Sequence, residues 1–224
     1  MKITKNELIE QLKEQENDLR RLRRSLGQAH IDLEPAQYLS SPVFETKVCE
    51  HSRGVIHRAR AEWDKNVTEP EFNGDWQRIN TYIKSVQGIG WKWEDDYTKN
   101  GQFAWCGAFA AFCYNKIRLT VRSKIFPSCY RLWNAWGGTS RKVSELSHGD
   151  IVVVYTSADR SPSYGNHITI CTSLPDNDGN FETIEGNARG QGPNGDFQEG
   201  VICRKRNLKD IAHIYRPASE DYDE

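Results

Sequence analysis

The sequence of 224 residues contains no long hydrophobic run. No segment approaches the roughly 20 consecutive apolar residues that a membrane-spanning helix needs, and the mean hydropathy is −0.74. The first residues, MKITKNELIEQLKEQEN, also lack the apolar stretch of a secretory signal. We therefore expect no membrane span, and a protein that is made in the cytoplasm and does not leave it by the general secretory route.

An excess of charge and a metal-binding cysteine pattern are missing as well. The 30 Lys and Arg residues balance 31 Asp and Glu, giving a net charge of −1, so we expect no broad basic surface and no nucleic acid as the main partner. The six cysteines include no C-x-x-C pair, which argues against structural zinc, and they are too sparse for a disulfide scaffold. We expect reduced thiols, and the question becomes whether one is reactive.

The N-terminal segment is predicted to be a helical extension. Thr4-Lys5-Asn6-Glu7 has the form of a capping box, and leucines then recur at three- and four-residue steps, which predicts a helix from about 5 to 27. Its charged face fits either a helix packed on its own domain or a docking helix or short coiled coil that pairs with a carrier or a second copy of the chain. We expect three parts: a helical extension and linker (1–42), a globular domain (43–217) and an acidic tail (218–224).

Within the globular part, helical patterns come first and strand patterns follow. Helices are predicted around residues 44–66, after Asp75, and from Ala104 to about Ile117, where the chain is apolar on nearly every face and should be buried. Alternating runs then predict five strands, with the glycine-rich stretch 186–200 as one of the separating turns. The fold class is therefore α+β, with helices packed on a C-terminal antiparallel sheet. The strands are Asp150–Thr156, His167–Ser173, Phe181–Asn187, Val201–Lys205 and Ile211–Arg216.

Four polar residues could form a reactive site. Cys106 lies where a polar loop runs into the buried helix, and a helix N-terminus favours a thiolate. His167 begins a strand, and Glu185 and Asn187 are two residues apart on another strand, so they should share one face. If the two strands are neighbours, His167 lies beside both. Ordinary structural roles stay open: a core cysteine, a surface histidine and a hairpin end.

The ordered motifs WCGAFAAFC, GDIVVVY, NHITI, TIEGN and VICRKRNLKDIAHIYRP resemble the CHAP domains (cysteine, histidine-dependent amidohydrolases/peptidases) of the NlpC-type papain-like superfamily, over about residues 70–217. The resemblance implies a papain-like fold with Cys106 as the nucleophile and His167 as the general base and acid. It implies an orienting role for Glu185, which Asn187 could share. The family cleaves amide bonds of peptidoglycan and its chemistry needs no metal or other cofactor.

Substrate contacts are predicted around the cysteine. The Cys106 N–H would stabilise the oxyanion, together with a side chain just upstream, for which we choose Gln102. Five of the seven tryptophans lie between residues 91 and 136, where they either pack in the core or line a substrate groove. We select Trp93, Trp105 and Trp133 for the groove. Residues 94–96 are acidic but lack the oxygen spacing of a calcium loop, so we interpret them as a solvated turn and leave calcium as a minor alternative.

The resemblance implies an N-acetylmuramoyl-L-alanine amidase or a peptide endopeptidase that acts on peptidoglycan. The expected settings are a phage-type lysin and an injected antibacterial effector, because both reach the cell wall or periplasm without a secretory signal. An inhibitory, immunity or carrier protein could bind the N-terminal helix. Two alternatives stay open: a cysteine amidohydrolase or protease with a substrate outside the wall, and a non-catalytic binding module of the same fold.

Overall fold

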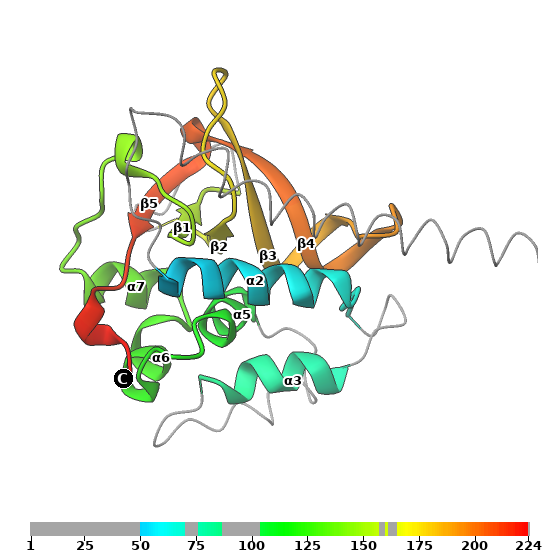
Figure 1. Ribbon diagram of the computed structural model, residues 1–224, viewed down its shortest axis with the longest axis horizontal. Helices are drawn as coiled ribbons and strands as arrows, with labels where there is room; N and C mark the ends of the chain where they lie inside the picture. The colour runs from blue at the N-terminus through cyan, green and yellow to red at the C-terminus, as the bar shows by residue number, and fades with distance from the viewer. Residues whose placement is uncertain (1–49, 70–75, 87–103, 157–159, 161–164, 224) are drawn as a thin grey trace, which may run out of the picture. The chain divides into compact units, whose positions relative to one another are not determined.

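The computed structural model describes residues 50–69, 76–86, 104–156, 160 and 165–223 (Figure 1). The helix expected over residues 5–27, the linker and the boundary at residue 42 lie outside the described residues. Trp93, Gln102 and the acidic residues 94–96 also lie outside them.

Five antiparallel strands form one sheet in the order β4-β3-β2-β1-β5. All five expected strands are present and the α+β class is confirmed. The first four strands pair in chain order, whereas β5 pairs with β1 at the edge of the sheet opposite β4. The strands are β1 (Ile151–Val154), β2 (His167–Cys171), β3 (Asn180–Gln191), β4 (Phe197–Asn207) and β5 (Ile211–Tyr215).

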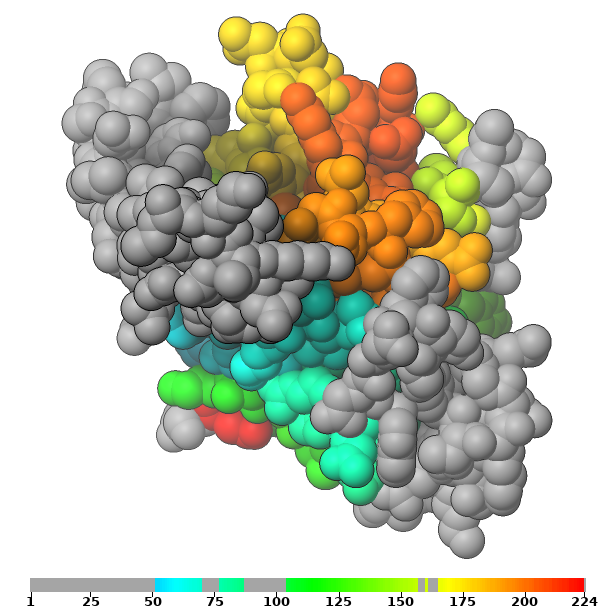
Figure 2. Space-filling model, turned by 90° about the vertical axis from the view of Figure 1, so that its right-hand side faces the viewer, coloured from blue at the N-terminus to red at the C-terminus, as the bar shows by residue number. Residues whose placement is uncertain are grey.

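The glycine-rich stretch 186–200 is not the turn that its composition predicted. β3 and β4 continue through most of it, pairing from Ala188 with Gly200 to Gln191 with Phe197. Gly200 forms a bridge with Thr68, and a side chain there would clash with the Val67 carbonyl. The glycine therefore permits a close backbone approach instead of marking a turn. Figure 2 shows the end of the hairpin formed by β3 and β4 (orange) directly above α2 (cyan).

The helices are α2 (Glu50–Asp64), α3 (Trp76–Lys84), α5 (Cys106–Cys113), α6 (Leu119–Ile125) and α7 (Cys129–Ala135). Every residue of α5 except Phe112 is buried, as its apolar sequence predicted. In Figure 1, α2 and α5 lie against one side of the sheet, and α3 lies beyond them. α5 contacts β2, β3, α2 and α3, so it is the central helix of the domain.

Alternation along β1 divides the core between the two faces of the sheet. Ile151 and Val153 belong to the large cluster that includes α5, whereas Val152 and Val154 belong to a smaller cluster on the other face. All four side chains are fully buried. Among the helices that the structure describes, none is both long and apolar enough to cross a membrane.

The described residues also contain short 3-10 helices before β1, between β4 and β5, and after β5. They cover Val143–Glu145, Leu208–Asp210 and Ser219–Asp221. After the last of them, Tyr222 pairs with Ile117 in an isolated bridge. Part of the acidic C-terminal segment thus packs back onto the residues that precede α6.

Candidate active site

The sulfur of Cys106 lies at the N-terminus of the central helix. Cys106 is the first residue of α5 and is 7% exposed. The first N–H groups of a helix have no carbonyl partner within it and favour a negative charge nearby. Backbone N–H groups of Ile168 and Gly107 interact with the sulfur, and so does the ring of His167. Groups from the start of α5 and from β2 therefore surround this thiol.

His167 connects the thiol to a carboxylate. It is the first residue of β2 and is 8% exposed, and its Nε2 lies 3.1 Å from Oε2 of Glu185. The ring also interacts with the Cys106 thiol, and this interaction raises the pKa of His167. Because Nε2 faces the carboxylate, Nδ1 is the nitrogen that remains for the sulfur. The structure therefore places the imidazole of His167 between Cys106 and Glu185.

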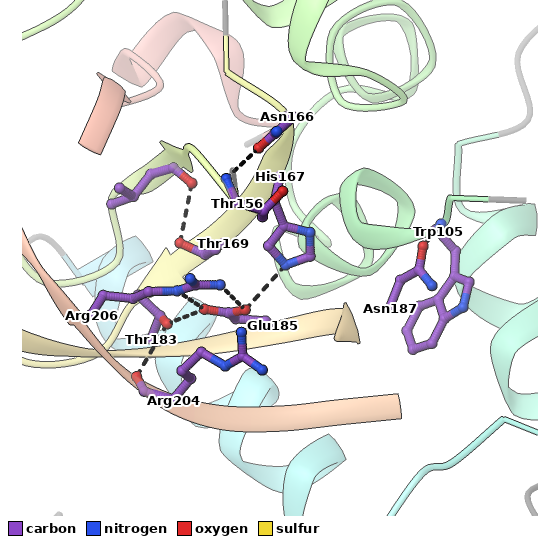
Figure 3. Close-up of polar contacts among 11 residues, drawn as sticks. Trp105, Thr156, Asn166, His167, Thr169, Thr183, Glu185, Asn187, Arg204 and Arg206 are labelled. Atoms are coloured by element: carbon purple, nitrogen blue, oxygen red, sulfur yellow. Dashed lines mark hydrogen bonds and ion pairs between the residues drawn. The ribbon is translucent and has the colours of Figure 1, made fainter. Parts of the chain in front are cut away.

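Glu185 is fully buried in β3 and its carboxylate accepts four hydrogen bonds. One comes from His167 and one from the Thr183 hydroxyl, at 2.6 Å to Oε1. Arg206 of β4 supplies the other two, from Nε to Oε1 and from Nη2 to Oε2, both at 2.7 Å. Figure 3 shows His167 and Arg206 approaching the carboxylate from different sides. This carboxylate is held in one orientation.

The electrostatics of the three groups favour a charged pair. Burial opposes ionisation of Cys106, but the hydrogen bond with His167 and the charge of its ring outweigh burial and lower the pKa of the thiol. Burial likewise opposes the charge on His167, but hydrogen bonds with Cys106 and Glu185 raise its pKa to about 9. The pKa of Glu185 stays far below its ordinary value, despite burial, because of His167 and Arg206. A thiolate and an imidazolium can thus coexist at neutral pH.

Such an arrangement is suited to nucleophilic catalysis. A thiolate attacks carbonyl carbons, an adjacent imidazolium can protonate a leaving group, and a third group fixes the ring orientation. The other described cysteines, Cys113, Cys129, Cys171 and Cys203, have thiols whose pKa is raised by burial. Cys106 is therefore the described cysteine with nucleophilic character.

Asn187 does not join Glu185 at His167, and this expectation is wrong. The strand register shifts between Glu185 and Ala188, and Asn187 has a positive φ of 56°, so the two-residue alternation is broken between them. The Asn187 Oδ1 accepts a hydrogen bond from the N–H of Trp105 (3.1 Å), and its Nδ2 donates to Glu69 (3.0 Å). Figure 3 shows Asn187 beside Trp105 and away from His167. Asn187 therefore holds the residue that precedes Cys106.

We expect the two small replacements of Asn187 to differ in stability. Asn187→Gly removes the acceptor of the Trp105 N–H and should cost about 1–3 kcal/mol of unfolding free energy. Asn187→Ala should cost about 1–2 kcal/mol more, because alanine, unlike glycine, is strained at positive φ. Urea denaturation of both variants measures the difference. Equal stabilities, or a more stable alanine variant, would contradict the role assigned to this backbone conformation.

The expected tryptophans have different surroundings. Trp105 has no exposed surface, donates from Nε1 to Glu69 (2.8 Å) and packs against Tyr82. A side chain without exposed surface does not line a groove, so this expectation is corrected: Trp105 is a core residue. Trp133 is partly exposed, and its ring lies 4.3 Å from that of His213.

Sequence reasoning missed three residues that support the site: Thr183, Arg206 and Glu69. The alternation along β3 puts Thr183 on the face of Glu185. It does not reveal the contact of Glu185 with Arg206, which lies 21 residues further along the chain.

Within the described ranges, no three His, Cys, Asp or Glu side chains are grouped as metal ligands. A groove of about 610 Å³ lies elsewhere, between α6 and α7.

No family model, curated protein or solved structure matches this chain significantly.

Proposed function

We propose that the chain is a cysteine amidohydrolase or peptidase of the papain-like type, resembling the CHAP domains, that cleaves an amide bond of peptidoglycan. The observation that carries the proposal is the buried series Cys106, His167 and Glu185, with a lowered thiol pKa and a raised imidazole pKa. The order of a cysteine on a helix N-terminus followed by a histidine on a sheet supports the papain-like comparison.

The reaction would proceed in two halves. The Cys106 sulfur attacks the amide carbonyl carbon, and a tetrahedral oxyanion forms. The intermediate collapses as His167 donates its proton to the leaving amine, which leaves a thioester on Cys106. Neutral His167 then takes a proton from water as the water attacks the thioester carbonyl. Collapse of the second intermediate releases the carboxylic acid and restores the thiolate and the imidazolium.

The N-terminus of α5 supplies stabilisation for the oxyanion. The Cys106 N–H is in the first turn of the helix, where the N–H groups have no carbonyl partner within the helix. These N–H groups can donate to the negative oxygen of the tetrahedral intermediate. Glu185 keeps the imidazole ring oriented through both halves, because Thr183 and Arg206 hold its carboxylate. These contacts support acyl transfer to and from Cys106 by the two halves of the reaction above.

The substrate class rests on the resemblance in the motifs around Cys106, His167 and Glu185. Peptidoglycan is the partner that it implies, with cleavage at the N-acetylmuramoyl-L-alanine bond or within the peptide. A phage-type lysin and an injected antibacterial effector are the settings that we propose, with action at the wall or in the periplasm. An inhibitory or carrier protein at the N-terminal segment belongs to the same proposal.

Digestion of purified sacculi tests the function. The full chain should release new amino groups from sacculi, whereas Cys106→Ala should release none above background, because the alanine variant has no nucleophile. Mass spectrometry of the fragments identifies the cleaved bond. Activity of the wild type on other amides, combined with inactivity on walls of several peptide chemistries, would favour a substrate outside the wall.

A non-catalytic binding module gives a different result. In that case Cys106 would be inert to iodoacetamide at neutral pH in the folded protein, and sacculi would be bound without release of amino groups. Cys106→Ala would then bind sacculi as the wild type does, and neither protein would hydrolyse them.

A further inference from the structure

Arg206 makes the most extensive contact with Glu185 of any described side chain. Its guanidinium donates from two nitrogens to the two carboxylate oxygens, at 2.7 Å each. The Arg206 side chain is 10% exposed and that of Glu185 is 0% exposed. Arg206 lies on β4, and its Nη2 donates to Oε2, the same carboxylate oxygen that faces His167 (Figure 3). The planar guanidinium fits a carboxylate in this paired geometry, which a lysine cannot reproduce.

The charges of the buried group balance only when Arg206 is included. A thiolate at Cys106 and a carboxylate at Glu185 carry two negative charges, and an imidazolium at His167 carries one positive charge. Arg206 supplies the second positive charge, which makes the four groups neutral. Without it, the same state would hold one net negative charge in a buried site, and such a charge is costly.

We propose that Arg206 is a positioning residue that acts through Glu185, fixing the carboxylate by paired hydrogen bonds and balancing the charge of the buried thiolate and imidazolium pair. The proposal rests on the proposed function in that Cys106 serves as the nucleophile. In this proposal Arg206 acts on Cys106 and His167 through Glu185 and not through the substrate. It thereby sets the pH range over which the thiolate and imidazolium pair exists.

Other charged and titratable groups lie around the site. Arg204 of β4 is on the same sheet face as Glu185 and carries a further positive charge, which every Arg206 variant retains (Figure 3). Cys129 of α7 interacts electrostatically with Cys106. Cys203 of β4 interacts with Glu185 in the same way from the opposite face of the sheet, where it is paired with Ile184. Burial raises the pKa of both thiols, to about 11 for Cys203. They therefore stay neutral near pH 7. Tyr215 of β5 interacts with Cys129 and has a pKa raised by burial. Arg60 of α2 and Glu182 of β3 interact with Cys203, and they add one charge of each sign.

Titration of the substrate-free protein tests the proposal. Thiolate absorbance at 240 nm, measured as the difference from the Cys106→Ser protein, reports ionisation of Cys106, and histidine NMR reports protonation of His167. In Arg206→Gln both midpoints should move up by about one pH unit, because a charge next to a titrating system shifts its pKa on that scale. Arg206→Lys should keep both midpoints within about half a unit of the wild type while turnover falls, because it retains the charge and loses the fork.

Glu185→Gln is the matched control of opposite sign. It leaves Arg206 uncompensated, so both midpoints should move down, and Glu185→Gln with Arg206→Gln should lie between the single variants. Unchanged midpoints in folded Arg206→Gln, or the same direction of shift in Arg206→Gln and Glu185→Gln, would overturn the proposal. If Arg206→Gln does not fold, the lysine, Glu185→Gln and double variants decide by the same criteria. Since both midpoints are measured without substrate, a failure here is distinct from inactivity on sacculi.

Discussion

His167→Ala is expected to abolish the reactivity of Cys106 at neutral pH. The variant removes both the hydrogen bond and the charge that lower the thiol pKa against the effect of burial, so the thiol should become a protonated core cysteine. Removal of one member of such a catalytic group lowers turnover by about 10⁴-fold or more. Alkylation by iodoacetamide at pH 7, with the modified cysteine located by mass spectrometry, measures the first effect, and amide hydrolysis measures the second.

His57→Ala provides the control for this experiment. His57 lies on α2 with its side chain exposed, and its replacement should change neither measurement. A folded His167→Ala protein that is still alkylated at Cys106 as fast as the wild type would contradict the coupling of the two residues. Equal losses in both histidine variants would indicate a general effect on the protein.

Gly107→Ala is expected to cause a large loss of stability. A Cβ on Gly107 would overlap the carbonyl oxygen of Phe126 and lie 3.1 Å from Cδ1 of Ile168. A backbone carbonyl cannot rotate away as a flexible side chain does, so α5 would have to move. Overpacking of this kind costs about 3 kcal/mol, measured as unfolding free energy in urea. The movement should also displace the adjacent Cys106 and slow its alkylation.

The same substitution at Gly54 should have the opposite sign. Gly54 lies within α2, where the nearest atom to an added Cβ is Nη1 of Arg58 at 3.3 Å. The end of that side chain can shift, and alanine in a helix interior is more stable than glycine by about 0.5–1 kcal/mol. A comparable destabilisation at both glycines would contradict the account of packing at Gly107.

Hydrophobic periodicity explains why much of the fold was predictable. The run from Cys106 to Cys113 is apolar on nearly every face, and a helix of that composition is stable only at the centre of a domain. β1 and its neighbour β2 are short and buried at every position, because hydrophobic clusters cover both faces of the sheet there. The helices α6 and α7 were missed because each is short, and tertiary contacts stabilise helices of that length more than local sequence does.

The site was predictable only as far as a regular strand pattern holds. His167 and Glu185 follow from the order of motifs, and they meet in the structure. Asn187 was misplaced because the register shift beside it is not visible in the residue pattern. The contact of Arg206 depends on the register of β3 with β4, which the residue pattern does not give, and the expected strand ended at Lys205, one residue before Arg206.

The protonation state of His167 is the most direct test of the account. An NMR titration of the histidine ring in the wild type should show an imidazolium that persists to a pKa of about 9, and in Cys106→Ala that pKa should fall because the negative partner is gone. A ring that titrates near pH 6.5, the ordinary value for histidine, or a pKa that does not respond to the loss of the sulfur, would contradict the charged pair on which the proposed chemistry depends.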